Sequence, residues 1–517
     1  MVPPARTDPE GTSETKQHEA AEQLAAAAGE LTKASTKKLK QWLTIESAAG
    51  FREMELEVAG LARAAADRIV ELVLRARVED SDFEGRCSKA ARRGRRESEA
   101  GETLRSGARR EVSVTMLGGS TVRVRVGYLR PDLSGRSGPR RGTGRRGAGG
   151  AGLYPVLAAL GIWFGVTPGL ADEITRQVTD SDSVRSGRAA LARRGIDLGH
   201  KQTLRIVNGF GQRAVEQRSA WIARRLEAAP TSGGPLKGQR VVIGIDGGRI
   251  RERVQLGGRR NAKTGHHRFE APWREPKLFT IYVVDNEGKG SEIFRPVYDG
   301  TMEDCDAVFR MLAGYLRALG AQEAKELIVV GDGAKWIWER VGPLTEAIGI
   351  EPEKVRQIVD WFHAVETIEK VADARAQWPE GEHAKWVKRA KDYLYAGDTA
   401  GLMAHFDGLG VGRRATVVNK HRDYFESNTA RMQYRAFAAA GLPCGSGAIE
   451  SAIRRVINLR MKGNGTFWRI ENAEAMLMLR GYLKAGRFDD LVDWSMATAA
   501  DWWAAKQAPL VEMAATR

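Results

Sequence analysis

The chain has 517 residues, with 81 lysines and arginines against 65 aspartates and glutamates, and a formal net charge of +16. This length predicts two to four domains and is sufficient to bury a sizeable hydrophobic core. Its three cysteines, Cys87, Cys305 and Cys444, form no CxxC pair, which argues against a zinc ribbon or a disulfide framework. No apolar run reaches the roughly 18 residues of a membrane span, and the polar start lacks the regions of a signal peptide, so we expect a cytoplasmic protein.

Residues 1–45 are rich in Ala, Glu, Lys and Thr and show little periodicity, which predicts a disordered or loosely helical tail. Residues 46–130 are expected to form a helix and a β-hairpin. Apolar residues recur at helical spacing over 51–78. Two segments of period two, 112–116 and 122–126, then flank the turn-forming pair Gly118-Gly119, and Arg123 and Arg125 share one face of the second strand.

A basic block occupies residues 84–150, where 17 lysines and arginines face 6 acids. Such a block suits a polyanion such as DNA or RNA, and a solvated arm is the alternative interpretation. Within it, the eight glycines of 131–152 predict a Gly/Arg linker between domains.

Residues 153–230 have a helical pattern that includes two helices joined by a short turn at 195–198. These proportions are typical of a helix-turn-helix, in which Lys201, Gln202 and Arg205 near the start of the second helix would meet DNA. A plain helical hairpin is the alternative.

From residue 238 on, the pattern predicts an α/β region. Its elements are strands at 240–246, 278–285 and 291–298, a helix at 302–319, a strand at 326–331, a helix at 335–348 and a strand at 355–360. Three strands, then αβαβ, then a helix that carries an acid is the element order of the ribonuclease H fold. We therefore predict a ribonuclease H-like mixed sheet over 238–365 and 441–490, a helical insertion at 366–440, and a C-terminal helix or tail at 491–517.

Three acids occupy the positions that phosphoryl-transfer chemistry requires. Asp246 and Asp332 follow short apolar strands, and Glu450 lies on the later helix. Three converging carboxylates can anchor two Mg²⁺ or Mn²⁺ ions, which activate the attacking oxygen and stabilise the leaving oxygen of a phosphodiester. Each aspartate taken alone is more often a turn or helix cap, and that is how we interpret Asp285, Asp299, Asp304 and Asp306.

Other polar residues are expected around this site. Asp360 and His363 follow the fifth strand and are assigned as auxiliary active-site residues, with a capping Asp and a helical His as the alternative. A cluster further along is suited to phosphate contacts: Arg454, Arg455, Arg460 and Lys462. Neither GxGxxG nor GxxxxGK[ST] is present, which argues against a nucleotide-dependent helicase or kinase.

Several long phrases resemble the bacterial insertion-sequence transposases of the ISKra type, which have an Asp-Asp-Glu site. The matching phrases, in the family's order, are IDGG, VVGDGAKWIWERV, QIVDWFHAVETIEKVA, RMQYRAF, GLPCGSGAIESAIRRVINLRMKGNGTFW and AEAMLMLRGYL. Asp360-x-x-His363 is also similar to the Asp/Cys-x-x-His signature of Mutator-like transposases. Two departures are the missing N-terminal cysteine pairs and a first motif that lacks the commoner Thr after Gly.

The resemblance implies a DNA transposase that cleaves at terminal inverted repeats and joins the ends to target DNA, with Asp246, Asp332 and Glu450 as its metal-binding triad. It also implies double-stranded DNA as partner, a homodimer or higher oligomer on that DNA, and a bacterial, nucleoid-associated location. A stand-alone metal-dependent nuclease and a non-catalytic DNA-binding regulator are the alternatives.

Overall fold

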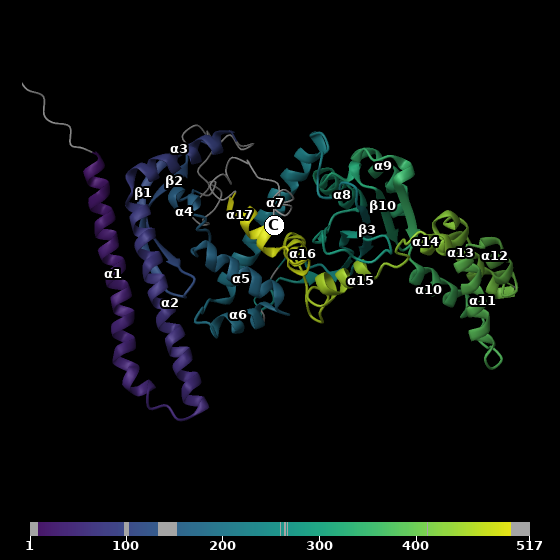
Figure 1. Cartoon of the computed structure of the whole chain (residues 1–517), viewed down its shortest axis with the longest axis horizontal. Helices are drawn as coiled ribbons and strands as arrows, with labels where there is room; N and C mark the ends of the chain where they lie inside the picture. The colour runs from purple at the N-terminus through teal and green to yellow at the C-terminus, as the bar shows by residue number, and fades with distance from the viewer. Residues whose placement is uncertain are drawn as a thin grey trace, which may run out of the picture. The chain divides into compact units, whose positions relative to one another are not determined.

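A computed structural model describes residues 9–97, 103–132, 152–258, 260–262, 265, 267–410 and 412–497 (Figure 1). Most of the predicted 131–152 linker and residues 498–517 of the predicted tail lie outside this part of the chain. The chain forms two compact units: the first extends to Phe210 and takes in the described residues from Val492 on, and the second comprises Gly211–Leu491. Helix α7 (His200–Glu227) runs from one unit into the other.

The first unit begins with two long helices, α1 (Pro9–Trp42) and α2 (Ala48–Glu79). Of the two interpretations of this tail, the helical one agrees with the structure over Pro9–Trp42. Strong helix formers such as Ala, Glu, Lys and Gln favour this helix without an apolar stripe. Glu57 of α2 accepts a hydrogen bond from the indole of Trp42 at 3.0 Å and forms an ion pair with Lys38, so the end of α1 is held against α2.

A β-hairpin follows helix α3 (Ser81–Glu97) in this unit. Strands β1 (Leu104–Thr115) and β2 (Thr121–Pro131) pair antiparallel and extend beyond the predicted segments. Val122, Val124 and Val126 are buried whereas Arg123 and Arg125 are exposed, which confirms the predicted alternation. Three helices complete the unit before α7: α4 (Pro155–Ala159), α5 (Pro168–Asp180) and α6 (Val184–Ala192).

The second unit is built on a five-stranded mixed sheet, so the predicted α/β class is confirmed. Its strands are β3 (Arg240–Gly247), β8 (Lys277–Val284), β9 (Val297–Thr301), β10 (Glu326–Gly331) and β11 (Val355–Val359). Their order is β11-β10-β3-β8-β9, with β10 parallel to β3 and β11, and β8 antiparallel to β3 and β9.

The sheet differs from the predicted one in two places. The third strand spans Val297–Thr301 rather than 291–298, because Asp285 to Ser291 form a turn closed by backbone hydrogen bonds. Between β3 and β8 lie two short antiparallel pairs that the sequence did not predict, since two-residue strands have no readable period: β4 (Ile250–Arg251) with β7 (Trp273–Arg274), and β5 (Val254–Gln255) with β6 (Phe269–Glu270).

Helices lie before, between and after these strands. The helices of the α/β region are α8 (Cys305–Leu319), α9 (Lys335–Ile348), α10 (Trp361–Ala372), α15 (Gly447–Ile453) and α16 (Ile470–Lys484). The boundary between the two units falls within α17 (Phe488–Ala497). Where the insertion was predicted, the structure has α11 (Glu382–Ala396), α12 (Thr399–Asp407), α13 (Ala415–Glu426) and α14 (Tyr434–Ala439). In the described part of the chain, no helix has the length and hydropathy needed to cross a membrane.

The two faces of the sheet are covered by different helices. On one face, the ring of Phe279 in β8 lies edge-on to Tyr315 of α8, with ring centroids 5.6 Å apart. On the other, Gly244 of β3 faces Ile449 of α15 so closely that an added Cβ would lie 2.9 Å from the Cβ of Ile449. Glycine at 244 thus lets the helix that carries Glu450 lie directly on the central strand.

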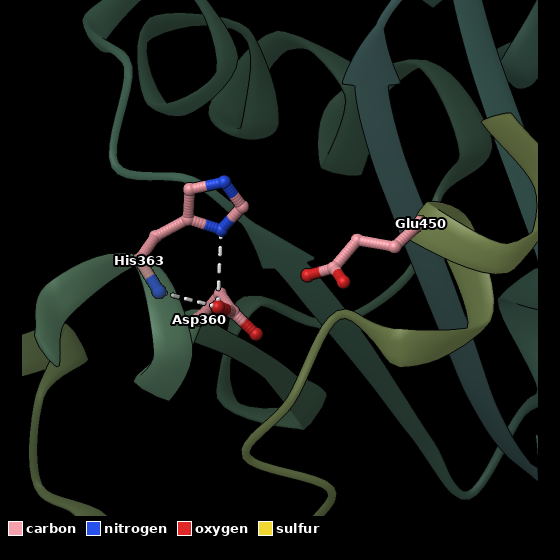
Figure 2. A group of neighbouring side chains, drawn as sticks. All are labelled: Asp360, His363 and Glu450. Atoms are coloured by element: carbon pink, nitrogen blue, oxygen red, sulfur yellow. Dashed lines mark hydrogen bonds and ion pairs between the residues drawn. The ribbon is translucent and has the colours of Figure 1, made fainter. Parts of the chain in front are cut away.

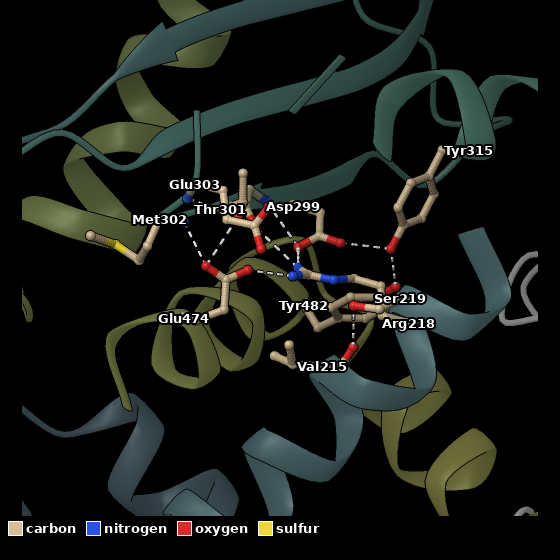
Figure 3. Close-up of polar contacts among 11 residues, drawn as sticks. Val215, Arg218, Ser219, Asp299, Thr301, Met302, Glu303, Tyr315, Glu474 and Tyr482 are labelled. Carbon is tan, nitrogen blue, oxygen red and sulfur yellow. Dashed lines mark hydrogen bonds and ion pairs between the residues drawn. The ribbon is translucent and has the colours of Figure 1, made fainter. Parts of the chain in front are cut away.

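A buried ion network joins α7, β9, α8 and α16 on the Tyr315 side (Figure 3). Arg218 donates to Asp299 Oδ1 at 2.6 Å and to the carbonyl of Gly300 at 3.0 Å, and it also pairs with Glu474. Asp299 is fully buried and accepts a further hydrogen bond from the hydroxyl of Tyr315 at 2.7 Å. The interpretation of Asp299 as a cap is therefore wrong, whereas Asp304 does cap α8 through the N–H of Ala307.

Candidate active site

Three adjacent strands deliver aspartates to one edge of the sheet. In the parallel register, Val330 of β10 is level with Gly244 of β3 and with Ile358 of β11. Side chains two residues apart lie on the same face of a strand. Asp246, Asp332 and Asp360 each follow one of these level residues by two positions. The alternation, continued just past the strand ends of β10 and β11, therefore places all three on the α15 face at the carboxyl end of the sheet.

The turn after β10 holds Asp332 in place. Asp332 Oδ1 accepts the backbone N–H of Ala334 at 2.9 Å. Gly333 has a φ of +89°, which favours glycine, and the ring of Tyr424 packs so close that an added Cβ would lie 2.5 Å away. The hydroxyl of Tyr424, on α13, donates to the carbonyl of Asp332 at 3.2 Å. The helical segment between β11 and α15 thus supports the backbone at this acid.

Asp360 and His363 form a local unit at the start of α10. Asp360 is fully buried and caps the helix, because its Oδ1 accepts the backbone N–H of His363 at 2.7 Å. The same oxygen lies 3.0 Å from Nδ1 of the His363 ring. The capping alternative is therefore correct for Asp360, and it coexists with a place beside the acids.

Asp360 also connects this unit to the helix of Glu450. Its second oxygen accepts the backbone N–H of Ser446, and the Ser446 hydroxyl donates to Glu450 Oε1 at 2.6 Å. Figure 2 shows the side chains of Asp360, His363 and Glu450 directed toward one another from two different segments. One ligand atom from each of these three residues lies within 4.8 Å of the others, which makes them a possible metal-binding group.

The three predicted catalytic acids are near one another but less tightly grouped. Within the described residues, Asp246, Asp332 and Glu450 do not form a set with ligand atoms all inside that 4.8 Å limit. Burial, together with the charges of Asp332 and Glu450, raises the pKa of Asp246 to about 6, although the N–H of Gly247 and the charge of His363 act to lower it. The closest group of ligand atoms therefore contains one predicted catalytic acid, Glu450, and the two residues assigned as auxiliary, Asp360 and His363.

Charge around the site is divided between acids and one imidazole. The hydrogen bond to Asp360 raises the pKa of His363 to about 9, against its partial burial. Burial alone would raise the pKa of Asp360, but hydrogen bonds from His363 and Ser446 hold it below its usual value. At neutral pH the pair is thus an imidazolium and a carboxylate beside the other acids.

The three predicted acids have the ligand chemistry that a divalent cation requires, although they are less tightly grouped than Asp360, His363 and Glu450. Asp246, Asp332 and Glu450 offer carboxylate oxygens, the ligands that Mg²⁺ and Mn²⁺ prefer, and after burial the charges of Asp332 and Glu450 contribute to the raised pKa of Asp246. A cation bound among them would relieve the repulsion between these charges.

The predicted DNA-contacting residues divide into two groups. Lys201, Gln202 and Arg205 line one hollow of about 520 Å³ in the first unit, and Arg205 also donates to the carbonyl of Phe164 at 3.1 Å. Phe164 itself has a φ of +60°, unusual for a residue other than glycine.

The second group, next to Glu450, is only partly exposed. Arg454 and Lys462 are exposed, as a phosphate contact requires. Arg455 is half-buried and donates to the hydroxyl of Tyr298 at 3.0 Å. Arg460 is 7% exposed and lies over the ring of Trp468, so in this structure it packs on an aromatic face, and its phosphate contact stays a prediction.

Comparison of the chain with protein-family models, with curated proteins and with solved structures finds no match.

Proposed function

We propose that this chain is a DNA transposase with an Asp-Asp-Glu site in a ribonuclease H-like domain. One observation carries the proposal: adjacent strands place Asp246 and Asp332 at the same sheet edge, where the charge of Glu450 acts on Asp246. The strand order β11-β10-β3-β8-β9, with only β8 reversed against its neighbours, supports the ribonuclease H-like assignment. The phrases that resemble ISKra-type transposases support the choice of transposase.

The chemistry follows from the donor set. Asp246, Asp332 and Glu450 would hold Mg²⁺ or Mn²⁺, which when bound supplies Lewis-acid activation of the attacking oxygen and stabilises the leaving oxygen. Asp360 fixes the Ser446 backbone and so the approach of Glu450. The protonated His363 ring carries a positive charge and can donate a hydrogen bond to a phosphate oxygen.

Two displacements of the same kind complete the reaction. In the first, water attacks phosphorus at the end of the element, and the bond from phosphorus to the 3′ oxygen breaks. In the second, the freed 3′ hydroxyl attacks a phosphodiester of target DNA, and a bond from phosphorus to a target 3′ oxygen breaks. One site can serve both steps because only the nucleophile changes.

The test uses the purified full chain, DNA carrying the inverted repeats that flank the coding region, and Mg²⁺ or Mn²⁺. Joined products support a transposase, cleavage without joining indicates a stand-alone nuclease, and shifted but intact DNA indicates a regulator. Asp246→Asn should abolish cleavage while DNA binding is kept. Asp285→Asn is the matched control, because Asp285 lies in an exposed turn and accepts two backbone N–H groups through one oxygen that asparagine also offers.

A further inference from the structure

Helix α2 carries an exposed apolar stripe along nearly its whole length. Four of its large members are Phe51 (54% exposed), Val58 (39%), Ile69 (39%) and Val73 (55%). The stripe is continued by small, exposed residues at helical spacing: Ala62, Ala66 and Ala76. From Phe51 to Ala76 it extends about 37 Å at the rise of an α-helix. Isolated surface apolar residues need no explanation, but an aligned row of this length does.

The other side of α2 is already used inside the first unit. Leu74 and Val78 are buried in a core with the valines of the hairpin. Asp67 is buried as well, and it accepts the backbone N–H groups of Gly118 and Ser120, both at 2.8 Å. The orientation of α2 is therefore fixed by these contacts, so the stripe cannot turn inward without breaking them.

Five residues of the stripe fall on the a and d positions of a seven-residue repeat, which Glu55 and the half-buried Ala65 and Leu72 complete, whereas Ala66 and Val73 fall on neighbouring e positions. With Ala62 and Ile69 as a positions, the a positions are Glu55, Ala62, Ile69 and Ala76, and the d positions are Phe51, Val58, Ala65 and Leu72. Seven of these eight residues are apolar, over almost four heptads, which is the length at which a sustained heptad pattern indicates a coiled coil.

The geometry points to a second copy of this chain as the occupant: we propose that two α2 helices pair antiparallel through this stripe. An antiparallel pair sets a positions against d positions. Centred between Ala62 and Ala65, it places Phe51 opposite Ala76, Val58 opposite Ile69, and Ala62 opposite Ala65 of the other copy. Large residues at the ends then meet small ones, and the alanines allow close approach at the two-fold axis.

The charge of Glu55 favours the antiparallel over the parallel direction of the helix pair. In a parallel, in-register pair Glu55 would face the same residue of the second copy, and like charges in that position repel. In the antiparallel pair it faces Leu72, with Arg68 and Arg75 one turn away on either side. Both arginines pair with Glu71 of their own helix, at 2.7 and 2.8 Å, and their side chains are 50% and 43% exposed, so the three residues together present a net positive charge to Glu55 of the other copy. The single charge of the stripe is thus complemented only in the antiparallel arrangement.

This inference does not rest on the proposed catalytic function, since it uses residues of α2 alone. The first test measures the mass of the full chain, without DNA, by sedimentation. The native chain should be dimeric at micromolar concentration. Val58→Glu and Ile69→Glu, which leave the buried face of α2 unchanged, should each raise the dissociation constant at least tenfold. The matched control, Leu56→Glu, changes an apolar residue off the stripe that is more exposed (50%) than Val58 or Ile69 (39% each), and this variant should stay dimeric.

The second test reads the direction by disulfide trapping. The background replaces Cys305 and Cys444, which are half-buried, and keeps the buried Cys87. Phe51→Cys/Ala76→Cys should form a covalent dimer on mild oxidation, and neither single substitution should. A monomeric native chain, unchanged dimerisation of Val58→Glu and Ile69→Glu, or cross-linking of Phe51→Cys alone would each overturn the proposal.

Discussion

Substitution of Arg218 by methionine should strongly destabilise the second unit. The Arg218 side chain is 3% exposed and Asp299 is fully buried, so neither charge has bulk water as a substitute partner. Arg218→Met keeps much of the aliphatic volume but removes every guanidinium donor. Asp299 then keeps only neutral donors, the hydroxyl of Tyr315 at 2.7 Å and the N–H of Gly300 at 2.8 Å.

The size of the effect follows from leaving a charge buried without its counter-ion. Removing one partner of a buried pair costs about 3–5 kcal/mol. Burial also raises the pKa of Asp299, and without Arg218 opposing it the carboxyl is expected to take up a proton, which limits the loss. At roughly 2 °C per kcal/mol for a domain of this size, the midpoint of thermal unfolding should fall by about 6–10 °C.

Calorimetry of the full chain measures this shift. Two further variants show whether the shift comes from leaving the Asp299 charge buried without its partner. Arg218→Met/Asp299→Leu removes both charges and should recover much of the loss, because Glu474 still accepts a hydrogen bond from Thr301 at 3.1 Å. Arg356→Met breaks an ion pair to Glu326 whose arginine is 48% exposed, so its cost should stay below about 1 kcal/mol. A double variant no more stable than Arg218→Met would refute the reasoning.

Three further outcomes are expected. Asp360→Asn offers one acceptor oxygen for donors that now use two, so DNA cleavage should fall about 10–100-fold with DNA binding kept; full activity would remove Asp360 from the site. Gly244→Val should lower stability by about 1–3 kcal/mol through the clash with Ile449, measured by denaturant titration, and Ile449→Ala should relieve part of it. Burial lowers the pKa of His405, so the folded state binds its proton less readily and loses stability as pH falls below about 6.5; thermal midpoints should show a smaller acid-induced fall in His405→Gln.

The place of the candidate active site in the sheet was predictable because its signal is local. A run of apolar residues that ends in Asp246 or Asp332 marks a strand and its carboxyl end within a few positions. Parallel neighbours then bring such ends together. The buried network was not predictable in the same way, because Arg218 meets Asp299 and Glu474 across 81 and 256 positions of the chain. Nothing in the local pattern distinguishes Asp299 from a turn aspartate.

The sequence left open whether residues 1–45 are disordered or helical, and it did not predict the burial of Arg460, for a different reason. The sequence rules used for them rest on apolar periodicity and on charge, whereas α1 is favoured by residue propensity and by contacts of its last turn with Glu57. Arg460 is charged but has a long aliphatic stem and a planar head that stacks on Trp468. A cluster of arginines in sequence therefore does not establish a basic surface.

The close approach of Glu450 to Asp360 depends on backbone path rather than on residue type. Gly244 leaves room for Ile449, so α15 can lie on the central strand, and the N–H of Ser446 then reaches the second oxygen of Asp360. That oxygen is available because the first is occupied by His363. The capping role of Asp360 thus directs its free oxygen toward the segment that carries Glu450, and a residue that looks purely structural in sequence becomes the link between the sheet edge and the last acid of the site.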